Sequence, residues 1–403
     1  MDRSQNQVKT ALVLPGGGAR GAFQVGVLKA IAELLPRQAS NPFPVISGTS
    51  AGAVNAIVLA TRAHKLRTAV AELERVWAHF RCHHVYKTDH LTMLRSSLHW
   101  MASLALGGWL VGTPKSLLDN APLRELLSRN VHFPRIRDAI DAGHLEAIAV
   151  TAAGYASARS TTFFEARGDR AGWERTRRSG VNAQLGLDHL MASIAVPYVF
   201  PPTRLGDEYF GDGAMRQATP LSPAVHLGAD RILVIGIRDE TGGRDPDASE
   251  TPPSFAQIAG YMLDTLFMDG LYSDLERITR INDLLDAVPG EAVRVGDRDM
   301  RPVDTMLIVP SRDLRVIAEK HRAELPFAIR ALLRGVGGKS PGENRLLSFL
   351  LFEQAYTREL IKLGYEDAMR VKDELRDFVT GADVPRLFAP AWIERDLSGF
   401  NSG

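Results

Sequence analysis

A serine flanked by glycines is the first candidate for chemistry. Residues 48–52 read Gly-Thr-Ser-Ala-Gly, with an apolar run before them and an alanine-rich segment after them. This pattern predicts a strand that turns sharply into a helix at Ser50. Gly48 and Gly52 remove the Cβ atoms that would clash in such a turn, and the helix N-terminus favours negative charge there. Ser50 is therefore a candidate nucleophile, and the alternative is a tight turn whose serine only caps the helix.

A glycine-rich loop precedes this turn. Residues 16–21 read Gly-Gly-Gly-Ala-Arg-Gly and stand between an expected strand and an expected helix. Gly16, Gly17 and Gly18 present backbone N–H groups without side chains, which suits an oxyanion hole. Arg20 either braces this loop or meets a phosphate. The alternative is a turn that only allows a helix to pack closely.

The same glycines also raise the possibility of a nucleotide site. Gly16, Gly18 and Gly21 have the spacing of the dinucleotide fingerprint, which expects an acidic residue about 20 positions further on. Here the second expected strand ends in the turn at Ser50 instead. A P-loop is excluded because no Gly-Lys-Ser/Thr follows the loop. The oxyanion interpretation is therefore favoured over dinucleotide binding.

A serine hydroxyl needs a base, and Asp212 is the best candidate. Asp212 stands between two glycines, so a turn can press its carboxylate against another segment. A carboxylate of ordinary pKa, about 3.9, is a weak base, but burial raises its proton affinity. A Ser-His-Asp triad fits poorly, because the one histidine after residue 226, His321, lies in a charged helical stretch. The alternative for Asp212 is a residue that only caps a glycine turn.

These residues require a sheet that brings distant segments together. Strands alternate with helices from residue 10 to about 240, which predicts a three-layer α/β core with a buried, mainly parallel sheet. Residues 239–254 are polar and rich in proline and glycine, and mostly helices follow them. We therefore expect a core over 8–240 and a helical extension over 241–403. Expected elements are strands at 10–15, 44–46, 146–153, 160–166 and 231–237, a strand at 305–309 that returns to the sheet, and helices at 346–363, ending before Gly364, and 365–378.

Composition and charge indicate the class of protein and its expected partners. The chain has 403 residues, is 45% hydrophobic, and balances 48 basic against 47 acidic residues. That balance gives no reason to expect nucleic acid as a partner. The single cysteine fits a reducing compartment. No signal peptide or membrane-spanning segment is apparent, so we expect a cytoplasmic protein whose membrane contact, if any, is peripheral.

Three further patterns could contribute to a site. Residues 98–112 form the most apolar window, with two tryptophans, and suit a core or lid helix with some lipid contact. Residues 346–352 are also apolar and suit an acyl chain. Several histidines gather around one cysteine, but their spacing fits no zinc pattern, so we expect no metal and no cofactor. These residues are His79, Cys82, His83, His84 and His90.

Taken together, the motifs resemble those of the patatin-like phospholipases. The glycine loop, the Gly-Thr-Ser-Ala-Gly turn, the segment Met-Ala-Ser-Ile-Ala-Val-Pro at 191–197 and the Asp212-Gly213 pair occur in that family's order. The resemblance covers about residues 8–240 and implies a three-layer α/β/α patatin-like core. It also implies a Ser-Asp dyad, with Ser50 as nucleophile, Asp212 as base and Gly16, Gly17 and Gly18 as oxyanion donors. The supporting motif residues are Arg20, Gly21, Gly48, Gly52 and Gly213.

The expected function is that of a serine acyl hydrolase acting on lipid esters, most naturally phospholipid or lysophospholipid at a membrane surface. The reaction would proceed through an acyl-serine intermediate and needs no metal. Two alternatives remain open at this point. One is acyl transfer to an acceptor other than water, and the other is a non-catalytic lipid-binding or scaffold protein that uses the helical extension. The oligomeric state is not readable from the sequence.

Overall fold

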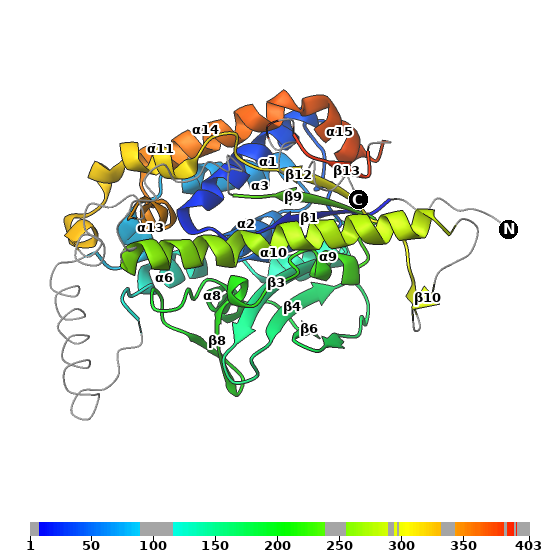
Figure 1. Cartoon of the computed structure of the whole chain (residues 1–403), viewed down its shortest axis with the longest axis horizontal. Coiled ribbons are helices and arrows are strands. Elements are labelled where there is room, and N and C mark those ends of the chain that lie inside the picture. The colour runs from blue at the N-terminus through cyan, green and yellow to red at the C-terminus, as the bar shows by residue number, and fades with distance from the viewer. Residues whose placement is uncertain are drawn as a thin grey trace, which may run out of the picture.

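The computed structural model describes residues 8–88, 116–237, 255–288, 294–295, 298–331, 343–382, 385–390 and 392. The apolar window at 98–112, the polar segment at 239–254 and His90 lie outside these residues. The described part of the chain builds one 11-stranded mixed sheet and one small two-stranded sheet (Figure 1). The strands of the large sheet are β1 (Thr10–Leu14), β2 (Val45–Thr49), β3 (Ala147–Gly154), β4 (Ser160–Ala166), β5 (Trp173–Arg175), β6 (Arg178–Asn182), β7 (Thr203–Leu205), β8 (Glu208–Asp212), β9 (Arg231–Ile235), β12 (Asp304–Ile308) and β13 (Leu387–Phe388), and the small sheet pairs β10 (Arg294–Val295) with β11 (Arg298–Asp299).

The centre of the large sheet is parallel. Its order is β13-β12-β9-β1-β2-β3-β4-β6-β5, and every neighbouring pair from β13 to β3 runs parallel. The strand β1 is buried along its whole length, as are β2 and β9 on either side of it. Apolar strands of this kind are covered on both faces. Beyond β3 the sheet becomes mixed, because β4 and β8 both pair with β3 antiparallel.

Helices cover both faces of the sheet, which confirms the predicted three-layer α/β/α fold. Side chains of β1 alternate between two hydrophobic cores, with Leu12 and Leu14 in one and Ala11 and Val13 in the other. Figure 1 shows α1 and α14 together on one side, while α10 runs across the other. The helices are α1 (Ala22–Leu34), α2 (Ala51–Thr61), α3 (Leu66–Trp77), α4 (Cys82–Val85), α6 (Ala121–Asn130), α7 (Pro134–Asp141), α8 (Leu187–Ser193), α9 (Ser222–His226), α10 (Phe255–Asp286), α11 (Leu314–Lys320), α13 (Glu343–Leu350), α14 (Gln354–Arg370) and α15 (Lys372–Thr380), with 3-10 turns η1 (Gly18–Gly21), η2 (Gly213–Met215) and η3 (Arg322–Glu324).

The predicted helix boundary before Gly364 was wrong. The structure has a break at residues 351–353, and α14 then continues through Gly364 to Arg370. A Cβ atom at Gly364 would lie 2.2 Å from the carbonyl oxygen of Phe23, and one at Gly26 would lie 2.0 Å from that of Ile361. These two glycines therefore allow α1 and α14 to cross at close range, and Gly364 serves helix packing rather than helix termination.

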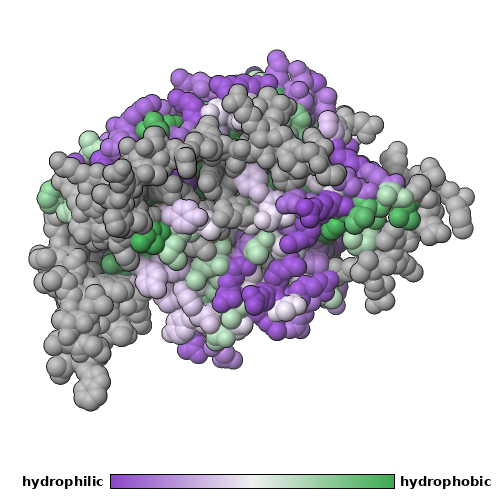
Figure 2. All heavy atoms as spheres, viewed as in Figure 1, coloured by the Kyte–Doolittle hydropathy of each residue, from purple (hydrophilic) through white to green (hydrophobic). Residues whose placement is uncertain are grey.

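The part of the chain after residue 240 joins the same sheet. The strand β12 pairs with β9 in parallel, and β13 pairs with β12. The division of the chain at residue 240 stays a prediction. Within the described residues, no helix has both the length and the apolar content needed to cross a bilayer. Among the residues that Figure 2 colours by hydropathy, hydrophobic ones form small areas separated by hydrophilic ones.

Candidate active site

Ser50 occupies a strained turn between β2 and α2. Its backbone has φ 54° and ψ −127°, a conformation that costs a non-glycine residue of order 1–3 kcal/mol. A Cβ atom at Gly48 would lie 2.6 Å from the Cα of Ala53, and one at Gly52 would lie 2.0 Å from the carbonyl oxygen of Leu14. Only glycine fits at both positions. The Ser50 side chain makes no capping hydrogen bond to α2, so the capping alternative does not describe this serine.

The strand β8 places Asp212 next to Ser50. On one edge of β3, Thr151 pairs with Thr49 of β2, and the following residue, Ala152, pairs with Asp212 of β8. Along this edge of β3, the pairing with β2 therefore ends at Thr151, and the pairing with β8 begins at the next residue. The Ser50 hydroxyl and the Asp212 carboxyl lie beside each other at this junction. Gly213 is required beside it, because a Cβ there would lie 2.2 Å from the carbonyl oxygen of Thr151.

The Asp212 carboxyl is buried, with 1% of its surface exposed. Burial raises the pKa of Asp212 from 3.8 to about 7, and the Ser50 hydroxyl and the Ala214 N–H act in the opposite direction. The Oδ1 atom accepts a hydrogen bond of 2.9 Å from the N–H of Ala214, so Asp212 also caps the turn η2. Among the described residues, Oδ2 has no hydrogen-bond partner of standard geometry.

The glycine loop lies against the turn at Ser50. Gly16 and Gly17 are buried, and Gly18 lines a cavity together with Ser50. A Cβ atom at Gly18, where φ is 55°, would lie 2.3 Å from the carbonyl oxygen of Phe349. A Cβ at Gly17 would lie 2.3 Å from a side-chain carbon of Ile237. The loop therefore needs glycine for close packing, and its backbone reaches the cavity.

Arg20 braces this loop. Its side chain is buried, its Nε and Nη2 atoms donate to the Ser348 hydroxyl at 3.0 and 2.6 Å, and its guanidinium lies 4.0 Å from the centre of the Phe349 ring. These contacts tie the loop to α13. Of the two roles expected for Arg20, the structure shows bracing. Gly21 lies beside Ala51, since a Cβ there would be 3.2 Å from that of Ala51.

A cavity with about 750 Å³ of empty space, part of it open to solvent, adjoins Ser50. Among the described residues that line it, Ser50 is the only one with a hydroxyl or charged side chain. Four of them come from the apolar window at 346–352. The lining residues are Gly18, Ser50, Ala51, Val54, Trp77, Phe80, Val85, Leu123, Ile194, Val196, Val199, Phe200, Leu346, Phe349, Leu350 and Phe352. The chemistry of this lining suits an apolar ligand.

A buried polar network supports the site from below, and the sequence analysis missed it. The Trp77 indole N–H donates to Asn55 Oδ1 at 2.8 Å, and Asn55 Nδ2 donates to Gln24 Oε1 at 2.9 Å. Gln24 Nε2 then donates to the carbonyl oxygens of Pro15 and Ile235 at 2.9 and 3.2 Å. The network joins α1, α2 and α3 to the ends of β1 and β9. The available signal was an amide side chain with apolar neighbours in each of α1 and α2.

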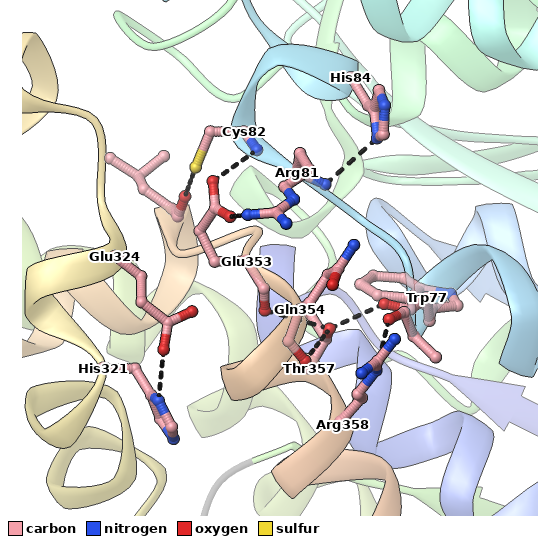
Figure 3. A network of polar contacts seen from close by, with 12 residues as sticks. Trp77, Arg81, Cys82, His84, His321, Glu324, Glu353, Gln354, Thr357 and Arg358 are labelled. Carbon is pink, nitrogen blue, oxygen red and sulfur yellow. Dashed lines mark hydrogen bonds and ion pairs between the residues drawn. The ribbon is translucent and has the colours of Figure 1, made fainter.

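A network of polar contacts joins segments that are far apart in the sequence (Figure 3). Glu353, at the start of α14, accepts hydrogen bonds from the backbone N–H of Cys82 at 3.1 Å and from Arg81 at 3.2 Å. The Thr357 hydroxyl donates to the carbonyl oxygen of Trp77 at 2.7 Å, and Arg358 donates to that of Ala78 at 2.8 Å. These bonds hold the end of α3 and the short α4 against α14.

The histidines near Cys82 form no metal centre within the described residues. His79 Nδ1 lies 2.7 Å from the carbonyl oxygen of Arg75, and His84 Nδ1 accepts from the N–H of Arg81 at 3.2 Å. The described part of the chain holds no group of three or more potential metal ligands. Each ring nitrogen of His321 contacts a glutamate, Glu324 or Glu359, at 2.9 Å. His321 is therefore engaged in a separate polar cluster.

The fold and the site define a class of protein: an α/β/α protein with a serine on a strained strand-to-helix turn and a buried aspartate beside it. A family model described as patatin-like phospholipase matches residues 12–225, and the chain belongs to that family. The crystal structure of VipD from Legionella pneumophila matches with a TM-score of 0.33 and 12% sequence identity, over 98% of this chain and 74% of that one. A search of curated proteins finds no match.

Proposed function

We propose that this protein is a serine acyl hydrolase that cleaves lipid esters, with phospholipids or lysophospholipids as the expected substrates. One observation carries the proposal: Ser50 lines a cavity whose other described lining is apolar, and the buried Asp212 carboxyl lies beside the Ser50 hydroxyl. An acyl chain in this cavity would place its ester carbonyl at Ser50. Membership of a patatin-like phospholipase family supports lipid acyl esters as the substrate class.

The proposed reaction begins with proton transfer. Asp212, deprotonated above about pH 7, accepts the Ser50 proton as the serine oxygen attacks the ester carbon. Backbone N–H groups of Gly16, Gly17 and Gly18 stabilise the oxyanion, and each such donor is typically worth about 3 kcal/mol. The alcohol portion of the lipid leaves with a proton from Asp212, and an acyl-serine remains. Water, activated by Asp212, then hydrolyses this ester and releases a fatty acid.

The test is a product analysis on a panel of phospholipids, lysophospholipids and neutral glycerides. We expect the wild-type protein to release fatty acid from at least one lipid class, and Ser50→Ala to release none above background. The variant removes one oxygen atom at a position without a helix-capping bond, so the fold should persist. Parent-rate hydrolysis by Ser50→Ala would overturn the proposal. An acylated acceptor in place of free fatty acid would identify acyl transfer.

A further inference from the structure

The Ser193 hydroxyl connects the nucleophile to the sheet. Ser193 is the last residue of α8 and is fully buried. Its Oγ atom accepts a hydrogen bond of 2.9 Å from the backbone N–H of Ser50 and donates one of 2.7 Å to the carbonyl oxygen of Thr151. On the other side of the strained Ser50 peptide, its carbonyl oxygen accepts from the N–H of Ala53 at 2.9 Å. Ser193 therefore holds the backbone N–H of Ser50, while α2 holds its carbonyl oxygen.

The residues that follow Ser193 also hold Asp212, the proposed base. Two residues after Ser193, the carbonyl oxygen of Ala195 accepts a hydrogen bond of 2.8 Å from the backbone N–H of Asp212. The carbonyl oxygen of Thr151 accepts the hydrogen bond from the Ser193 hydroxyl, and Thr151 directly precedes Ala152, the β3 partner of Asp212. Both proposed catalytic residues are thus fixed by residues 193 and 195. The two remaining residues of this segment, Ile194 and Val196, line the apolar cavity.

We propose that residues 193–196 form a positioning segment that sets the distance between Ser50 and Asp212, with Ser193 as its central positioning residue. This inference rests on the proposed acyl hydrolase function. Alternate residues of the segment have different contacts: 193 and 195 hold the backbone of Ser50 and Asp212, while 194 and 196 line the cavity proposed for the acyl chain.

Loss of the Ser193 hydroxyl has a defined physical consequence. In Ser193→Ala the buried N–H of Ser50 loses its acceptor and the buried carbonyl of Thr151 loses this donor. The peptide of Ser50, already at positive φ, is then free to rotate toward a less strained conformation. A displacement of about 1 Å between reacting groups costs about 10²-fold in rate. Ile194 and Val196 remain in the cavity wall, so substrate binding should change little.

The experiment compares Ser193→Ala, Ser193→Thr and Ser160→Ala with wild type on a medium-chain p-nitrophenyl ester. For Ser193→Ala we expect kcat to fall about 10²-fold with KM within about 3-fold. Fluorophosphonate labelling of the nucleophile should slow by a similar factor. Ser193→Thr keeps the hydroxyl and should restore most of the rate. Ser160→Ala removes a buried serine hydroxyl on β4 and is the matched control, expected at the wild-type rate.

The outcomes separate this inference from the proposed function. A folded wild-type protein that neither hydrolyses esters nor reacts with fluorophosphonate would refute the function itself. An active wild type with an equally active Ser193→Ala would refute only the positioning role, as would a loss confined to KM. If Ser193→Ala does not fold, Ser193→Cys replaces it, because a thiol is a weaker donor and acceptor. An intermediate kcat is then expected, and an unchanged kcat would overturn the inference.

Discussion

Replacing Asp212 with asparagine should stabilise the protein at alkaline pH while removing its activity. Burial raises the pKa of this carboxyl from 3.8 to about 7. Since each unit corresponds to about 1.4 kcal/mol, ionising Asp212 costs the folded state up to about 4 kcal/mol relative to the unfolded chain. At pH values between 3.8 and about 7, Asp212 carries a proton in the folded protein but not in the unfolded chain. Stability that is present at acidic pH is therefore lost as the pH rises through about 7, and asparagine, which does not ionise, avoids that loss.

The assay is urea unfolding of the wild-type protein and Asp212→Asn at about pH 5 and about pH 8.5. We compare the free energy of unfolding of the variant with that of the wild type. The difference, variant minus wild type, should be about 3 kcal/mol larger at pH 8.5 than at pH 5, because about two pH units of the titration fall in this window. Burial also raises the pKa of Asp274, to about 6, but this residue is common to both proteins and cancels. A stability difference that is the same at both pH values would refute the conclusion that burial raises the pKa of Asp212.

For the wild type, kcat/KM should rise with pH and level off above about pH 7, because only the deprotonated Asp212 accepts the nucleophile's proton; a rate independent of pH across this range would exclude it as base. Val54→Phe should lower the rate on long-chain esters at least about 10-fold and spare acetate esters, because Val54 lines the cavity. Val58→Phe, on the same helix, is the control, and equal losses in both variants would contradict an acyl site. Gly18→Ala should abolish hydrolysis, because its Cβ would lie 2.3 Å from a backbone oxygen. Gly168→Ala also changes a glycine at positive φ but meets open space, so an active Gly18→Ala enzyme would count against the loop's role.

The sequence predicted the local features of the site well because each depends on neighbouring residues. The strained turn at Ser50 follows from two glycines at a strand-to-helix junction, and the buried parallel strands follow from continuous apolar runs. The pairing of Ser50 with Asp212 was proposed from the glycines around Asp212 and the lack of a suitable histidine, and the family resemblance then supported it. It depends on β8 pairing with β3 just beyond the end of β2, a register between distant segments that no local pattern specifies.

Residues whose role comes from distant contacts were missed or misread. Gly364 was interpreted as a helix end, whereas it permits the close approach of α14 to α1. The motif containing Ser193 was noticed, but its bonds to Ser50 and Thr151 appear only once α8 is packed beneath the turn. Gln24 and Asn55 belong to helices whose apolar faces were the stronger signal.

The most direct test of the account is fluorophosphonate labelling of the intact protein, followed by mass mapping of the labelled peptide. We expect a single adduct on Ser50 in the wild type, none in Ser50→Ala, and strongly slowed labelling in Asp212→Asn. A folded wild-type protein that stays unlabelled, or one labelled on another residue, would contradict the assignment of Ser50 as the nucleophile.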